Sequence, residues 1–206
     1  LMHASVPMLA ACLAVADRQQ TETGAAVEGA HFLGAFVAGH EVSCKIAVAI
    51  APDHYYKGFH TSGTIGTFGA AVAAAKLLGL DQAGIARSIG IATSLAGGIR
   101  ASLGTQTKPL HVGWAAEKGV TAALLAREGL TSSASALDGP WGYLAVAGRG
   151  ADIDLVRGRI GKPFVMDAPG ISFKPYPCGA VTHPGMEALR LAMSESGWRA
   201  EDIERI

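Results

Sequence analysis

Basic side chains recur at three places where a polar loop runs into a predicted helix. His60 lies a few residues before the first of these helices, and Lys108 and His111 begin the second. Lys174 and His183 flank the segment before the third. Because a helix N-terminus carries partial positive charge, a cation there is unfavourable unless an anion binds beside it. The recurrence points to a bound anion, most simply a small polycarboxylate. Histidines that are neutral near pH 7 could transfer protons to and from such a ligand.

The sequence alone leaves alternatives to an anion site open. Three ordinary solvated loop ends account for the periodicity equally well. Cys178 could act as a nucleophile with His183, although a small structural thiol is the favoured interpretation. The chain has no GxSxG elbow, and it has neither HExxH nor paired CxxC, so we predict no metal site.

A GxxGxxG pattern occurs at Gly63, Gly66 and Gly69. It differs from the dinucleotide fingerprint GxGxxG, and no strand-like run precedes it. We therefore predict that these glycines allow helices to pack closely, and that they do not cradle a phosphate.

Composition excludes several classes of protein. The chain has 206 residues, of which half are hydrophobic, with 17 basic and 17 acidic side chains, so it lacks the basic excess of a nucleic-acid binder. Cys12, Cys44 and Cys178 form no CxxC, which favours a reduced, cytoplasmic compartment. The most apolar stretch, residues 31–51, is interrupted by charged and histidine side chains, so we expect no membrane span.

Hydrophobic periodicity predicts a mainly α-helical chain. We expect a short helix over residues 8–16 followed by a turn at the polar run 17–22, and then a long helix over residues 25–51 that Pro52 ends. Gly79 suits a position just after a helix, and Asp81 suits an N-cap. Further helices are predicted over residues 65–78, 81–95, 109–128, with Pro109 in the first position, and 152–160.

The character of the sequence changes near Lys162. Residues 171–176 alternate like a short strand, residues 186–195 have the pattern of a helix with proline in its first turn, and residues 198–206 have that of a turn and the start of a strand. We predict an all-helical domain over residues 1–165 and the beginning of a smaller α+β domain over residues 166–206. We also expect the chain to be a piece of a longer protein.

Three segments resemble one known family in the same order along the chain. They are GFHTSGTIGTFGAAVAAAKLLGL (58–80), TQTKPLHVGWAAEKG (105–119) and FKPYPCGAVTHPGMEAL (173–189), and they are similar to segments of the MmgE/PrpD family. This family includes 2-methylcitrate dehydratase, cis-aconitate decarboxylase and iminodisuccinate epimerase. The resemblance implies a large helical domain, a smaller α+β lid domain, an active site between them, and usually a homodimer.

The resemblance also implies which residues form the site. The histidine of the family's GFH motif corresponds to His60, the TKPLH lysine to Lys108, and the lysine of the F-K motif to Lys174. His3, in HASVPML, resembles the family's HPS segment, although Ala4 replaces the usual proline. These four residues are the catalytic candidates. The candidates for substrate binding lie in the same three motif segments: Thr64, His111, Tyr176, Cys178 and His183.

For function, the resemblance implies cofactor-free and metal-free chemistry on small di- or tricarboxylates. The leading hypothesis is a lyase of the 2-methylcitrate dehydratase type, which removes a proton next to a carboxylate and then loses water. A dicarboxylate epimerase and a non-catalytic carboxylate-binding helical module remain alternatives. Two departures leave the substrate open: the family's acidic DFDD-like motif would lie upstream of Leu1, and Gly179 occupies a position where the decarboxylase branch has histidine.

Overall fold

A computed structural model of the chain describes residues 2–148 and 153–205. The chain divides into two compact units, Leu1–Pro169 and Gly170–Ile206. The division falls four residues beyond the predicted boundary at 165/166. We describe each unit by itself.

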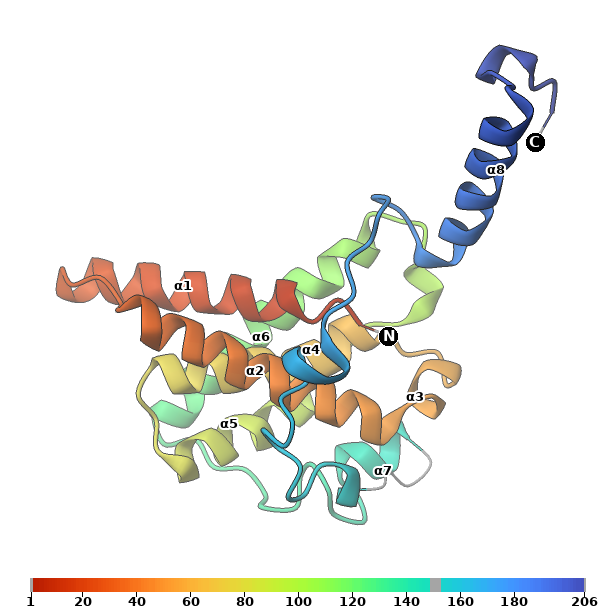
Figure 1. The fold of residues 1–206 in the computed structure, drawn as a ribbon. Helices are drawn as coiled ribbons and strands as arrows, with labels where there is room; N and C mark the ends of the chain where they lie inside the picture. Colours follow the sequence, from red (N-terminus) through yellow and green to blue (C-terminus); the bar gives the residue numbers. More distant parts are fainter. Residues whose placement is uncertain (1, 149–152, 206) are drawn as a thin grey trace. The chain divides into compact units, whose positions relative to one another are not determined.

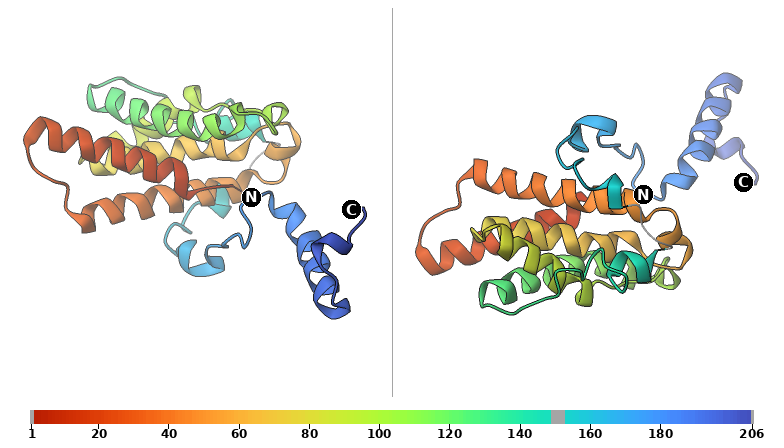
Figure 2. Two further views of the ribbon diagram at one scale, coloured as in Figure 1. Left: turned by 90° about the horizontal axis from the view of Figure 1, so that it is seen from above. Right: turned by 90° about the horizontal axis from the view of Figure 1, so that it is seen from below.

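The first unit begins with two long antiparallel helices, α1 (Ser5–Thr23) and α2 (Gly29–Ile50), which lie side by side (Figures 1 and 2). The predicted turn at residues 17–22 is wrong, because α1 continues through this polar run. The side chains of this run form bonds along the helix. Arg18 and Glu22 form an i,i+4 ion pair at 2.6 Å, and the Thr21 hydroxyl donates to the carbonyl of Asp17. The helix ends at Gly24, whose φ of 73° suits glycine.

Helix α4 (Thr61–Leu77) lies in the middle of the first unit and contacts α1, α2, α5 and α6 (Figure 2). It is buried on every side, and it begins four residues before the predicted start at Ile65. A Cβ on Gly66 would lie 2.9 Å from Pro7 Cγ, and one on Gly69 would lie 2.7 Å from the carbonyl oxygen of Gly39. The prediction that these glycines permit close helix packing is therefore confirmed.

The remaining helices of the unit are α3 (Asp53–Tyr56), α5 (Gln82–Leu95), α6 (Thr107–Arg127) and α7 (Tyr143–Ala147). Gly79 follows α4 with φ 74°, and the Asp81 side chain accepts a hydrogen bond from Gly84 N at 2.7 Å, as predicted. Helix α6 begins at Thr107, so Pro109 occupies its third position, where its missing N–H still has no partner in the helix. Short helical turns lie at Arg100–Ser102 and Ile153–Leu155, and the segment Met166–Gly170 is interrupted by the extended backbone of Ala168.

A buried carboxylate fixes the last part of the first unit. Glu41 on α2 is 2 % exposed, and it accepts hydrogen bonds from the N–H groups of Gly161 at 2.8 Å and Val165 at 2.7 Å. Lys45 lies 3.6 Å from the same carboxylate. The helix predicted over residues 152–160 is reduced to the turn Ile153–Leu155, while residue 152 lies outside the described residues. The segment is thus held by a side chain of α2 together with short turns of its own, such as the bond from Arg157 N to Ile153 O at 2.9 Å.

Helix α2 is long and apolar enough to cross a bilayer by length and composition alone. Half of its most apolar window is buried inside the bundle, and it carries the buried polar side chains His40, Glu41 and Ser43. This is also the pattern of a core helix in a globular domain. The absence of a membrane span stays a prediction.

The second unit contains helix α8 (His183–Ser196) and short turns at Ala180–Thr182 and Ala200–Asp202. The helix predicted over 186–195 is confirmed, with Pro184 in its first turn and Gly197 after its end at φ 69°. The strands predicted at 171–176 and after 198 are wrong for the described residues. An alternating pattern needs a second strand to pair with, and no such strand lies within 2–148 or 153–205.

Candidate functional site

His60 occupies the N-cap position of α4, at the end of a tight loop. The loop is held in place by backbone hydrogen bonds from His60 N to Gly98 O at 3.0 Å and from Arg100 N to Gly58 O at 2.7 Å. The side chain of His60 is only 6 % exposed. The segment Gly58–His60 is therefore fixed against the loop between α5 and α6, and the ring of His60 is directed by packing.

His111, in the second turn of α6, meets His60. Their Nδ1 atoms lie 3.1 Å apart, and both rings are buried. One of these nitrogens must carry hydrogen and the other must accept it, so a single hydrogen lies between the two rings. Gly98 permits this arrangement, because a Cβ there would lie 3.3 Å from the His111 ring.

The surroundings of His60 keep it neutral. Burial lowers the pKa of His60 to about 4, and the nearby basic groups His111, Lys108 and His3 add to this lowering. A neutral imidazole can accept a proton, but one with so low a pKa is a weak base. A bound anion would supply the missing countercharge, raise this pKa and make His60 a better base.

Lys108 lies in the first turn of α6, within electrostatic reach of His60. The N-cap side chains His60 of α4 and Gln106 of α6 make no capping hydrogen bond, although the first N–H of α6, at Thr107, donates to the Thr105 hydroxyl at 3.2 Å. Two helix N-termini and a lysine therefore gather near the His60–His111 pair. Such a group is suited to binding a carboxylate.

His3 lies just before α1 and is anchored to the first turn of α4. Its backbone N–H donates to the Ser62 hydroxyl at 3.0 Å, and its Nδ1 lies 3.1 Å from the same oxygen. The structure thus brings four predicted residues together: His3, His60, Lys108 and His111. Sequence reasoning missed Ser62, although its position two residues after the GFH histidine could have indicated that it lies near the site.

Thr64, a candidate for substrate binding, points into the core and does not face a ligand site. It is fully buried, and its hydroxyl lies 2.7 Å from Nε2 of His54. His54 is a second residue that sequence reasoning missed, because it belongs to none of the three basic junctions. Its contacts can be recognised only once α3, α4 and α7 are packed together.

The other four predicted residues, Lys174, Tyr176, Cys178 and His183, belong to the second unit. The Lys174 ammonium donates to the carbonyl of Cys178 at 3.0 Å, and the Cys178 sulfur lies 3.2 Å from the Thr182 hydroxyl. The rings of Tyr176 and His183 meet edge to face at 5.5 Å. These residues are grouped with one another, and their convergence with His60 and Lys108 stays a prediction.

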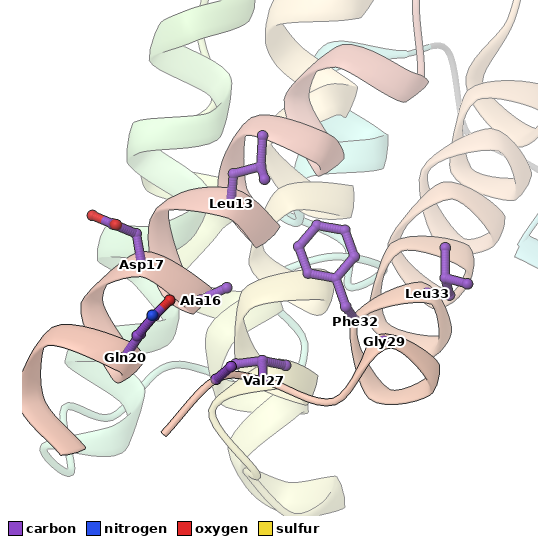
Figure 3. A pocket seen from close by; sticks show the side chains of 9 residues that line it. Leu13, Ala16, Asp17, Gln20, Val27, Gly29, Phe32 and Leu33 are labelled. Carbon is purple, nitrogen blue, oxygen red and sulfur yellow. The ribbon is translucent and has the colours of Figure 1, made fainter. Parts of the chain in front are cut away.

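The first unit also has a hollow of about 420 Å³ between the second half of α1 and the start of α2, shown in Figure 3. Leu13, Val27, Phe32 and Leu33 give it an apolar lining, with Asp17 and Gln20 at one side (Figure 3). None of the predicted site residues lines it. Within residues 2–148 and 153–205, no three His, Cys, Asp or Glu side chains group as a metal site would require.

The fold and the cluster define a helical-bundle domain that carries a basic, histidine-containing candidate site at the N-termini of two of its helices. Residues 1–156 match the MmgE/PrpD N-terminal domain, and the chain belongs to the MmgE/PrpD family. This confirms the resemblance that the three sequence motifs indicated.

Several curated proteins are similar to the chain. The human cis-aconitate decarboxylase is 35% identical over 156 residues, which cover 75% of this chain and 32% of that protein. The mouse cis-aconitate decarboxylase is 37% identical over 129 residues, 62% of this chain and 26% of that protein. The cis-aconitate decarboxylase-like protein oryM of Aspergillus oryzae is 32% identical over 144 residues, 68% of this chain and 30% of that protein. The chain thus spans about a third of the length of these relatives, which support a lyase-type member of the family.

Proposed function

We propose that the protein is a metal-independent lyase that acts on a small di- or tricarboxylate. The buried His60–His111 pair, which lies beside Lys108 and the N-termini of two helices, carries this proposal. Lys108 and the helix ends bind a substrate carboxylate, and His60 exchanges a proton at the carbon next to it. We also propose that the protein works as a cytoplasmic homodimer without a cofactor.

The bound carboxylate has two effects in this mechanism. It offsets the positive charge of Lys108 and of the helix ends, and it raises the pKa of His60 towards the range in which a histidine is an effective base. The same cations stabilise the negative charge that develops as the proton leaves carbon. For His60 to accept the proton at Nε2, its Nδ1–H must donate to Nδ1 of His111, and this bond fixes the orientation of the His60 ring.

Two lyase reactions fit this site. In a dehydratase of the 2-methylcitrate type, His60 removes the proton, and the hydroxyl on the next carbon leaves as water after a second group protonates it. In a decarboxylase, the bond to a carboxylate carbon breaks, carbon dioxide leaves, and a proton is added to the remaining carbon. The names of the similar human, mouse and Aspergillus proteins favour testing cis-aconitate for the second reaction.

One experiment tests the lyase and separates the two reactions. The protein is incubated with 2-methylcitrate, related hydroxy acids and cis-aconitate, while unsaturated product and released carbon dioxide are measured. A dehydratase gives unsaturated product from a hydroxy acid without carbon dioxide, and a decarboxylase gives carbon dioxide from cis-aconitate. Deuterium exchange at the carbon next to a carboxylate, without either product, would instead indicate an epimerase.

The role of His60 is tested by a substitution at that residue. We expect His60→Gln to lower kcat on the active substrate by about 10²- to 10⁴-fold, because general acid–base help is of that size. His31→Gln, an exposed histidine on α2, is the matched control and should keep wild-type turnover. Wild-type turnover by a folded His60→Gln variant would contradict the assignment.

A further inference from the structure

His54 is a buried histidine in the short helix α3, outside the residues to which the motifs assign a role. It is 1 % exposed, and both of its ring nitrogens have partners. Nδ1 lies 3.1 Å from the carbonyl oxygen of Ala147, and Nε2 lies 2.7 Å from the hydroxyl oxygen of Thr64. Thr64 is four residues after His60, in the first turn of α4.

These two bonds settle which ring nitrogen of His54 carries hydrogen. A carbonyl oxygen can only accept, so Nδ1 donates to Ala147, and the neutral ring leaves Nε2 as an acceptor. The Thr64 hydroxyl therefore donates to His54. Burial lowers the pKa of His54 and so favours this neutral form, with a smaller opposing effect from the Ala147 bond.

The ring of His54 also lies against the residue just before His60. It stacks on the Phe59 ring with centroids 4.5 Å apart and planes within 2° of parallel. The Phe59 N–H donates to the carbonyl of His54 at 3.3 Å. His54 thus contacts the chain on both sides of His60: Phe59 precedes it, and Thr64 bonds through its own N–H to the His60 carbonyl at 3.1 Å.

The other side of His54 is fixed to the end of α7. His54 donates to Ala147, while the Lys57 ammonium donates to the carbonyls of Val146, at 3.1 Å, and Gly148. Three consecutive carbonyls at the C-terminus of α7 therefore accept from the segment that leads into His60. A cation at this end of a helix is favourable. The loop before α4 is thereby tied to the rest of the unit.

We propose that His54 is a positioning residue for His60. Through the Thr64 hydroxyl and the Phe59 ring, it fixes the N-cap of α4 so that the His60 ring meets His111. The inference rests on the proposed function, which gives His60 the proton transfer. Because His54 lies behind the loop and contacts Phe59, Thr64 and Ala147, its loss should lower kcat and leave KM nearly unchanged.

Four substitutions separate the hydroxyl–imidazole bond from general packing. Thr64→Val removes the hydroxyl at constant shape, and Thr64→Ser keeps it. His54→Asn keeps a donor towards Ala147 but places no acceptor near Thr64, whereas His54→Gln places its amide oxygen near the Nε2 position. We expect Thr64→Val and His54→Asn to lower kcat by about 10- to 100-fold, since small misplacements of a reacting group have effects of this order. Thr64→Ser should stay close to wild type, and His54→Gln, which keeps the acceptor but loses the ring against Phe59, should fall between His54→Asn and wild type.

The ring signals of His60 give a readout that does not depend on turnover. They are assigned in a ¹H–¹³C NMR spectrum as the signals that His60→Gln removes. We expect them to move in Thr64→Val and His54→Asn and to stay in place in Thr64→Ser. Thermal unfolding of each variant is measured alongside, so that kcat refers to folded protein.

Two results would overturn the positioning role. One is a folded Thr64→Val variant with wild-type kcat. The other is a set of His60 ring signals in that variant that coincide with those of wild type. Failure of the proposed function looks different: His60→Gln itself would keep full turnover, while the movement of the His60 signals would still report whether His54 positions the ring.

Discussion

The two units hold their candidate residues in opposite ways. In Leu1–Pro169, His54, His60 and His111 are at most 6 % exposed and are fixed by hydrogen bonds and ring contacts. In Gly170–Ile206, none of the described residues is buried, and Phe173 and Val181 are about nine-tenths exposed. In the first unit, burial shifts the pKa values of the histidines. In the second unit, hydrogen bonds between exposed side chains shift the pKa values.

Local pairing in the second unit is clearest at Glu187. Its carboxylate receives the Arg190 guanidinium at 2.6 Å and the Tyr176 hydroxyl at 2.9 Å. The Arg190 hydrogen bond, followed by that of Tyr176, lowers the pKa of Glu187 to about 2. Water surrounds these groups, so the shift reflects the pair itself and adds little to the stability of a fold. A large pKa shift thus accompanies a buried core in one unit and a solvated cluster in the other.

Acid should destabilise the packed unit. Unfolding raises the pKa of His60 from about 4 towards its ordinary value of 6.5, and burial also lowers the pKa values of His40 and His54 in the fold. The unfolded chain therefore binds more protons than the folded chain below about pH 6.5, so stability is lost as pH falls towards 4 and levels off below it. His60 alone contributes about 3 kcal/mol to this loss.

The measurement is urea unfolding between pH 7.5 and 4.5. His60→Gln should reduce the slope of stability against pH by up to about 1.4 kcal/mol per pH unit between the two pKa values. An unchanged slope in this variant would mean that His60 is not held neutral by the fold.

Close helix packing should give the next largest effect, and α6 offers a matched pair of glycines. A Cβ on Gly119 would lie 2.6 Å from the backbone nitrogen of Ala71 on α4, whereas a Cβ on Gly113 meets no atom within 4 Å. We expect Gly119→Ala to lower the free energy of unfolding by about 1–3 kcal/mol through overpacking. Gly113→Ala should raise it by about 0.5–1 kcal/mol, because alanine favours a helix. Equal effects at the two positions, measured by urea unfolding, would contradict the packing of α4 against α6.

Much of the first unit could be predicted from the sequence. The glycines of GxxGxxG predicted close helix packing, and Pro52 predicted the end of a helix. Both are local signals, and the packed structure agrees with them. His60, Lys108 and His111 could be identified because basic side chains are unfavourable at a helix N-terminus unless an anion binds there. This signal is also local in the sequence. The polar run 17–22 misled the prediction, because its side chains bond along one exposed helix face, and a polar run alone does not distinguish this from a turn.

The unpredicted features all depend on residues far apart in the chain. The ring of His54 is anchored by the carbonyl of Ala147, which is 93 residues away, and the partners of the Glu41 carboxylate are the N–H groups of Gly161 and Val165. Neither contact leaves a periodic or motif signal in the sequence. The strand expected at residues 171–176 was wrong for a related reason, since strand structure depends on a partner that the alternating pattern does not specify.

The smallest expected effect belongs to the second unit. Glu187→Gln removes the carboxylate that accepts from Tyr176 and Arg190, and the hydrogen bond to Glu187 is the main cause of the raised pKa of Tyr176. We expect the Tyr176 pKa to fall towards its ordinary value of 10, measured by spectrophotometric titration with Tyr176→Phe as the reference. The thermal midpoint of the bundle should not change, because no described residue around Glu187 is buried. A midpoint several degrees lower would show instead that this surface cluster is coupled to the packed unit, and the contrast between the two units would no longer hold.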